Sequence, residues 1–201
     1  MTATVDRAHP VRRFEVHFDR ACAPTVTEIP VTSPPEPSAA GPGTKAATAT
    51  APTRPAGSSD FAPMDVSPSD VLQYAGTNTC VAIQTLRDPL GIPETEFRNK
   101  QTWTWDGVNV DSASVYVESV PGKTGWVAVT PTATYYGQYL PANGIEAFGY
   151  GQFYFYNPSV YNHTHEVDTL VEGNGSCSGE WYLSGTVPGD GSYITRDFYI
   201  Q

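Results

Sequence analysis

The sequence is poor in positive charge and has no long apolar run. Its 201 residues include 11 Lys and Arg against 21 Asp and Glu, a formal net charge of −10. Contacts to phosphate groups need a basic surface, so this balance argues against a nucleic-acid-binding protein. The longest uncharged stretch, 124–145, contains prolines, an asparagine and several threonines. It is therefore not the run of about 20 apolar residues that a membrane-spanning helix requires, and we expect no membrane insertion.

Motifs for catalysis, cofactors and metals are also lacking. The sequence has no G-x-S-x-G nucleophile motif, no C-x-x-C pair, and no glycine-rich phosphate loop followed by a helix. We therefore expect no cofactor and no metal, and a non-enzymatic protein is favoured over an enzyme. The first 20 residues have no apolar core of a signal peptide, because charged residues interrupt every apolar patch.

The N-terminal third has the composition of a linker. From Ala21 to Asp60, 31 of 40 residues are Pro, Ala, Thr, Ser or Gly, and none is aromatic. Such a segment cannot bury enough apolar area to offset its ordering entropy, so the composition predicts a disordered arm over 21–65. In the preceding segment 1–20, Phe14, Val16 and Phe18 alternate with polar residues, which indicates a possible strand at 12–19. That strand either adds to a sheet edge, of this chain or of a partner, or stays disordered.

The remaining segment, 66–201, is predicted to be all-β. A short helix is expected over 67–76, where Ser67 can cap the helix, Pro68 suits its first position and Gly76 can end it. Turn residues then separate segments that alternate in the manner of strands. Eight or nine strands predict an antiparallel β-sandwich or jelly-roll-like domain. The expected strands are 80–87, 100–106, 112–120, 125–130, 132–139, 146–156, 164–172, 178–184 and 193–200.

Three cysteines are present, and two of them open predicted strands. Cys80 and Cys177 either form a disulfide that closes a long loop or remain two buried thiols, while Cys22 lies in the arm. A disulfide requires an oxidising compartment, and on that basis we expect an extracellular or surface-exposed protein.

Aromatic residues are concentrated in the C-terminal two thirds. Residues 61–201 hold 22 of the 24 aromatics, and Phe148, Tyr150, Tyr154 and Tyr156 fall on one face of the strand 146–156. A row of rings with polar edges can bind a glycan or a protein surface, or it can fill a sandwich core. The same two interpretations apply to Trp103 and Trp105, which are two residues apart. The candidate binding residues are Tyr150, Tyr154, Tyr156, Trp103, Trp105 and Tyr116.

Two further groups of residues carry candidate chemistry. His163 and His165 share one face of a strand, but two histidines alone make an incomplete metal site, so we interpret them as a solvated strand start. A glycoside hydrolase needs a pair of carboxylates across a cleft. Such a pair is available from Glu118, Glu146, Glu166 and Glu180, and the piece 102–107 resembles a strand of small β-jelly-roll cellulases.

Three functions remain compatible with the sequence. The first is a non-enzymatic extracellular or particle-surface domain that binds a glycan or a protein partner through exposed aromatic rings. The second is a small β-jelly-roll glycoside hydrolase that uses two glutamates. The third is a structural subunit, for example a virion decoration protein, whose strand at 12–19 docks onto a neighbour. We expect the first.

Overall fold

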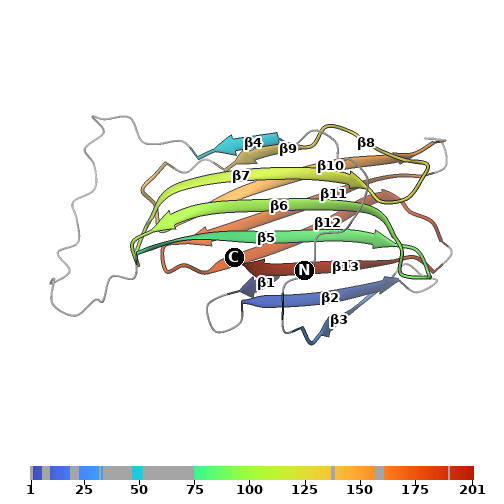
Figure 1. Cartoon of the computed structure of the whole chain (residues 1–201), viewed down its shortest axis with the longest axis horizontal. Helices are drawn as coiled ribbons and strands as arrows, with labels where there is room; N and C mark the ends of the chain where they lie inside the picture. The colour runs from blue at the N-terminus through green and yellow to red at the C-terminus, as the bar shows by residue number, and fades with distance from the viewer. Residues whose placement is uncertain are drawn as a thin grey trace, which may run out of the picture.

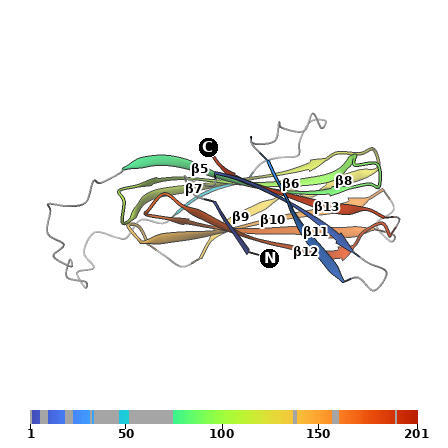
Figure 2. The same cartoon turned by 90° about the horizontal axis from the view of Figure 1, so that it is seen from below.

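The chain folds into two antiparallel β-sheets packed face to face (Figures 1 and 2). The computed structural model describes residues 2–5, 10–18, 23–31, 33, 47–51, 75–136, 139–156, 161–189 and 191–201. This arrangement confirms the prediction of an all-β sandwich. Among the described residues there is no helix that is long and apolar enough to cross a membrane. Most of the expected helix at 67–76 lies outside the described residues, and Gly76 is the first residue of a strand.

Six strands form the first sheet, sheet A. They follow the order β1-β12-β11-β10-β8, and β9 pairs with β10 beside β8. β10, β11 and β12 are long central strands in continuous register. The strand bounds are β1 (Thr2–Val5), β8 (Trp126–Ala128), β9 (Thr132–Tyr135), β10 (Gly144–Phe155), β11 (Asn162–Glu172) and β12 (Cys177–Thr186).

Seven strands form the second sheet, sheet B, in the order β3-β2-β13-β5-β6-β7-β4. β6 is the longest strand, with 13 residues, and it pairs with β5 and β7 along most of its length. The strand bounds are β2 (Val11–Phe18), β3 (Pro24–Ile29), β4 (Ala47–Thr50), β5 (Gly76–Arg87), β6 (Pro93–Trp105), β7 (Val110–Pro121) and β13 (Tyr193–Ile200).

The N-terminal segment is built into both sheets. β2 includes residues 12–18 of the strand predicted at 12–19, while residue 19 lies outside the described residues. β2 pairs with β13 of this same chain. Phe14 and Val16 are buried in the core, and Arg13 forms an ion pair with Asp197 of β13. The segment thus adds to an edge of its own domain. At that edge its alternate apolar side chains, Phe14 and Val16, are buried against the facing sheet.

The segment 21–65 also contributes strands. β3 pairs with β2, and β4 pairs with β7. The interpretation of this segment as a linker without regular structure does not hold for these ten residues. Thr and Val favour extended backbone, and an existing sheet edge supplies hydrogen-bond partners that the segment lacks on its own.

Side chains at alternate strand positions form the core between the sheets. Ala113, Val115 and Val117 of β7 are buried there, as predicted from their alternation. On β10 the inward positions include Gly149 and Gly151, and a Cβ at Gly151 would lie 2.5 Å from the Ser119 Oγ of β7. These glycines therefore let sheet A approach sheet B closely at this point.

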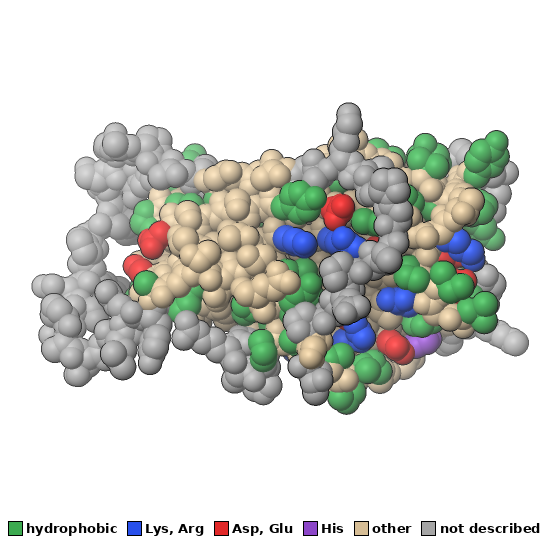
Figure 3. Space-filling model, viewed as in Figure 1, with side chains coloured by type: hydrophobic (Ala, Val, Ile, Leu, Met, Phe, Trp, Pro, Cys, Tyr) green, Lys and Arg blue, Asp and Glu red, His purple; other side chains and the backbone are tan. Residues whose placement is uncertain are grey.

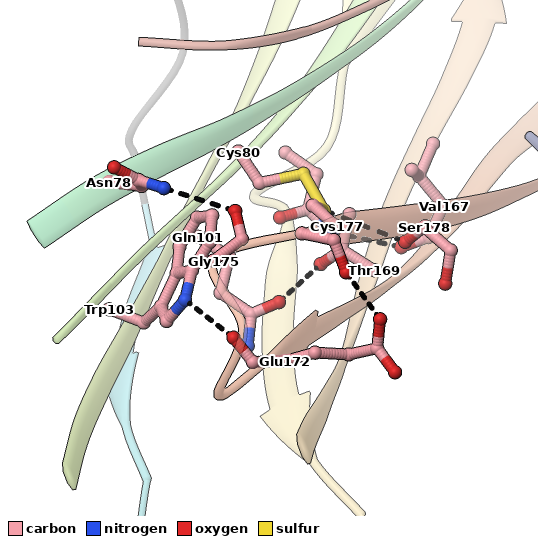
Figure 4. Close-up of a disulfide and its surroundings, with 12 residues drawn as sticks. Asn78, Cys80, Gln101, Trp103, Val167, Thr169, Glu172, Gly175, Cys177 and Ser178 are labelled. Carbon is pink, nitrogen blue, oxygen red and sulfur yellow. Dashed lines mark hydrogen bonds between the residues drawn. A yellow bond between two sulfur atoms is a disulfide. The ribbon is translucent and has the colours of Figure 1, made fainter. Parts of the chain in front are cut away.

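A disulfide joins the two sheets (Figure 4). Cys80 of β5 bonds to Cys177 of β12 across 97 residues of sequence, with a Cα–Cα distance of 6.2 Å. Of the two alternatives for these cysteines, the structure shows the disulfide. Beside it, Trp103 Nε1 donates to the Glu172 carbonyl oxygen (3.1 Å), and Asn78 Nδ2 donates to the Gly175 carbonyl oxygen (3.1 Å). The turn between β11 and β12 is thus fixed to sheet B.

Candidate binding face

Two of the candidate aromatic residues are core residues. Trp103 is fully buried and Trp105 is 2% exposed. Both occupy inward positions on β6, where their indole rings belong to the core between the sheets. Trp103 lies beside the disulfide (Figure 4). They are therefore excluded from an exposed binding surface. The physical reason is that bulky aromatic side chains at inward positions fill the space between the two facing sheets.

The two histidines also lie in the interior. His163 and His165 point the same way, as expected, but both are fully buried, so the interpretation as a solvated strand start is wrong. β11 lies between β10 and β12, and its odd-numbered side chains face sheet B. Among the described residues no three His, Cys, Asp or Glu side chains are grouped to hold a metal ion.

Hydrogen bonds join these buried histidines to polar side chains of sheet B. Thr95 Oγ1 lies 2.8 Å from His163 Nε2 and 3.1 Å from His165 Nε2. With its amide nitrogen turned toward His165 Nδ1 (3.1 Å), Gln84 also accepts from the Arg196 guanidinium (3.2 Å). Burial lowers the pKa of His163 to about 4, and burial, His163 and Arg196 lower the pKa of His165.

Charge is distributed unequally between the two sheets. The strands of sheet B carry six Lys or Arg and seven Asp or Glu residues, and Figure 3 shows basic side chains on the outer face of this sheet. The strands of sheet A carry no Lys or Arg at all. They carry five carboxylates, all at outward positions of β10, β11 and β12: Glu146, Glu166, Asp168, Glu172 and Glu180.

Carboxylates and aromatic rings alternate across the outer face of sheet A. In one cross-strand row, Phe148 of β10 pairs with Asp168 of β11, which pairs with Glu180 of β12. In the next row, Tyr150 pairs with Glu166, which pairs with Tyr182. Side chains paired in this way lie about 5 Å apart at their Cβ atoms. We call this surface the acidic aromatic face. It consists of Tyr136, Glu146, Phe148, Tyr150, Glu166, Asp168, Glu180 and Tyr182.

Three rings form a continuous row on this face. The ring centroids of Tyr136 and Phe148 are 6.2 Å apart, and those of Phe148 and Tyr150 are 6.4 Å apart. Tyr136 and Tyr182 are 47% and 46% exposed. The rings thus support one another while part of their surface remains in contact with solvent, as a recognition surface requires.

The carboxylates of the acidic aromatic face interact electrostatically. Burial, followed by repulsion from Glu146, Glu180 and Glu166, raises the pKa of Asp168 to about 6. The Asp168 Oδ1 atom is buried without a hydrogen-bond partner among the described residues. The same face raises the pKa of Tyr136, first by burial and then through its carboxylates. The electrostatic potential at this face is therefore negative, and a positively charged ligand would reduce the repulsion between its carboxylates.

Glu180 is held in place by two hydroxyl groups. Thr2 Oγ1 donates to Glu180 Oε1 (2.6 Å), and the Tyr182 hydroxyl donates to Glu180 Oε2 (2.6 Å). These bonds lower the pKa of Glu180, and they raise the pKa of Tyr182. Glu180 is thus an oriented and ionised group at one margin of the face.

No family model, curated protein or solved structure matches this chain. Its function must therefore be inferred from the geometry of its own residues.

The remaining predicted site residues are dispersed. Tyr154 occupies an outward position of β10 beyond Tyr150, and Tyr156 follows the strand with 85% of its surface exposed. Tyr116 lies on the outer face of sheet B. Glu118 is on that sheet too, where it accepts from Arg98 Nη1 (3.1 Å). Of the four candidate glutamates, the structure brings together only Glu146, Glu166 and Glu180.

On β11 and β12, the sequence reasoning missed two members of the face, Asp168 and Tyr182. Their outward positions follow from the alternation of β11 and β12, since Asp168 has the parity of Glu166 and Tyr182 has that of Glu180. What the sequence did not supply was the pairing of these strands with β10, which aligns their outward side chains in rows.

Proposed function

We propose that this protein is a non-enzymatic recognition domain that binds a positively charged segment of a protein partner on the acidic aromatic face. The observation that carries the proposal is the composition of sheet A, whose outer face has five carboxylates, a row of rings and no basic residue on its strands. Lysine and arginine side chains combine attraction to carboxylates with stacking on aromatic rings. The face offers both at neighbouring positions.

The disulfide indicates the kind of compartment in which this function would take place. Cys80 and Cys177 are bonded in the structure, which is consistent with an oxidising compartment. Recognition at a cell or particle surface fits that environment. The proposal places the protein outside the cell or on a particle surface.

Binding of a hexa-arginine peptide tests the proposal. The measurement is its affinity at about 150 mM salt, where long-range attraction to a −10 protein is largely screened. In the double variant Phe148→Ser, Tyr150→Ser the net charge is unchanged, and we expect at least fivefold weaker binding. Tyr116→Ser on sheet B is the matched control and should leave the affinity within twofold of the wild type.

Two results would contradict the proposal. Equal affinity of the wild type and the double variant would show that the rings take no part in binding. The other result is a glycan that binds the wild type and binds the double variant more weakly. In that case the acidic aromatic face would still be the binding surface, but its ligand would be a glycan and not a positively charged segment of a protein.

Glycoside hydrolysis is a second candidate, favoured by one observation. Asp168 has a raised pKa, as a general acid requires, and lies directly opposite the ionised Glu180. Retaining hydrolases place their two carboxyl groups about 5.5 Å apart. Release of reducing sugar from a polysaccharide panel, lost in both Asp168→Asn and Glu180→Gln, would support this activity. Silence of the wild type on all substrates would exclude it for that panel.

The third function, a structural subunit, loses its original basis. It assumed that the strand at 12–19 docks onto a neighbouring molecule. In the structure that strand is β2, and it pairs with β13 and β3 of its own chain.

A further inference from the structure

Strand β12 is only half covered on its outer side. β1 pairs with its first four residues, in the register Val5 with Cys177 through Thr2 with Glu180. From Trp181 to Thr186, β12 pairs only with β11 among the described residues. An open strand edge is a template on which another extended segment can pair.

An apolar pocket lies next to this open edge. Its volume is about 310 Å³, at the lower end of the range for ligand-binding pockets. It is formed where the end of β2, the end of β12 and the turn to β13 meet. Its lining consists mainly of apolar side chains and glycines: Phe18, Leu183, Gly185, Val187, Pro188, Gly189, Gly191 and Ser192.

The apolar side chains around the pocket occupy inward strand positions but are not covered. Phe18 has the parity of the buried Phe14 and Val16 on β2, yet it is 43% exposed. Outside the lining of the pocket, Val26 of β3 pairs directly with Val16 and is 45% exposed. Leu183 has the parity of the buried Trp181 on β12 and is only partly buried. The described part of the sandwich therefore leaves its interior incomplete at this corner.

β1 shows what kind of segment this edge accepts. Its inward residues, Ala3 and Val5, are buried in the core, while its outward residues, Thr2 and Thr4, face solvent. A segment that continued this pairing along the rest of β12 would place its inward side chains toward the pocket. Its outward side chains would lie on the side of Glu180 and Glu166, where carboxylates favour basic residues.

We propose that the edge of β12 from Tyr182 to Thr186 is a docking site for an extended segment of a partner protein. The segment adds to sheet A by backbone hydrogen bonds, inserts an apolar side chain into the pocket, and directs basic side chains outward. A second copy of this chain is disfavoured as the occupant, because each copy carries a net charge of −10. This site adjoins the acidic aromatic face and shares Tyr182 with it, but it differs in its mode of binding, because the partner segment pairs with the backbone of β12.

A random 12-residue peptide library displayed on phage, selected against the full chain, tests the proposal. We expect enriched peptides to alternate apolar residues with Lys or Arg. Such a peptide should bind Leu183→Lys at least tenfold more weakly than the wild type. Ser184→Lys is the matched control, since it adds the same charge on the opposite side of the strand, and it should reduce affinity less than threefold.

A second measurement keeps the test valid if Leu183→Lys fails to fold. The enriched peptide should slow amide hydrogen exchange between Tyr182 and Thr186 of the wild type, and its backbone N-methylated form should not bind. Enriched peptides without alternation, equal binding by the N-methylated form, or no enrichment would overturn the proposal. Protection confined to Phe148 and Tyr150 would also overturn it, while leaving the acidic aromatic face as a binding surface.

Discussion

Asp168 of β11 lies directly opposite Glu180 of β12, and both carboxylates face outward from sheet A. Paired like charges destabilise a sheet, and no described Lys or Arg of the sheet A strands offsets this pair. Destabilising arrangements of this kind are common at functional sites. The stability of the domain should therefore respond to changes at this face in a way that ordinary surface positions do not.

Replacing Asp168 by Asn should stabilise the fold at neutral pH. The folded-state pKa of Asp168 is raised to about 6 from 3.8, so the contribution of this group to stability is full below pH 3.8 and is lost as the pH rises through 6. We expect a gain of about 1 kcal/mol at pH 7, reduced from the full linkage value because solvent screens a half-exposed group. Urea unfolding at pH 7 and pH 3.5 measures it.

The gain should largely vanish at pH 3.5, where the wild-type carboxyl is mostly protonated in both states. Glu166→Gln is the control and removes a charge from the same face without removing a buried oxygen, so its gain should be smaller. An Asn variant that is less stable at pH 7 would contradict the electrostatic account.

Acid should destabilise the interior through the buried histidines. His163 has a folded-state pKa of about 4 against 6.5 in the unfolded chain, so the stability it contributes is present above pH 6.5 and is lost as the pH falls toward 4. Its share of the loss between pH 7 and 4.5 is about 2–3 kcal/mol. The pH dependence of urea unfolding should shrink by about this amount in His163→Gln.

Comparison with His163→Gln is needed because protonation of Asp168 raises the free energy of unfolding between pH 7 and 4.5, whereas protonation of His163 lowers it. His165 adds to the effect of His163, with Thr95, Gln84 and Arg196 as its polar neighbours in the interior. Identical pH dependence in the wild type and His163→Gln would exclude the buried histidine as the cause.

Reducing the disulfide should lower the free energy of unfolding by about 2–4 kcal/mol, because the bond between Cys80 and Cys177 closes a long loop in the unfolded chain. Denaturant unfolding with and without reductant measures the change. Cys22→Ser is the control and should behave as the wild type under both conditions. No shift on reduction would contradict a stabilising role for this bond.

Adding a methyl group at Gly151 should destabilise the sandwich. A Cβ there would meet Phe97 and Ser119 of sheet B, and overpacking of this kind costs about 1–3 kcal/mol. Gly189→Ala is the control, because nothing lies within 4 Å of the position its Cβ would take. Thermal unfolding of the two variants should separate them, and equal stabilities would show that the sheets are less closely packed at β10 than the structure indicates.

The sequence predicts the C-terminal strands well, and the N-terminal ones poorly. All nine strands expected between 80 and 200 are present, because alternation and turn residues are local signals. β3 and β4 depend on sheet edges supplied by distant segments, β2 and β7, so their own composition did not reveal them. The start of β6 at Pro93 was missed because its first residues include Glu94 and Glu96, which are unusual in a buried strand.

The candidate face was predicted only in part. Tyr150 and the carboxylates Glu146, Glu166 and Glu180 were identified from their strands, but the sequence could not place them on one surface. That grouping depends on the register of β10 with β11 and of β11 with β12. For Trp103 and Trp105, the sequence correctly predicted that both side chains lie on one face of a strand. It could not show that this face points into the core, because that depends on the position of the second sheet.

The central claim is that the outer face of sheet A is the surface that recognises a positively charged partner. Amide chemical shifts of the isotope-labelled chain, recorded during titration with hexa-arginine at about 150 mM salt, test it most directly. We predict that the largest changes fall on Phe148, Tyr150, Glu166 and Asp168. Changes concentrated on sheet B, or spread evenly over both sheets, would contradict it.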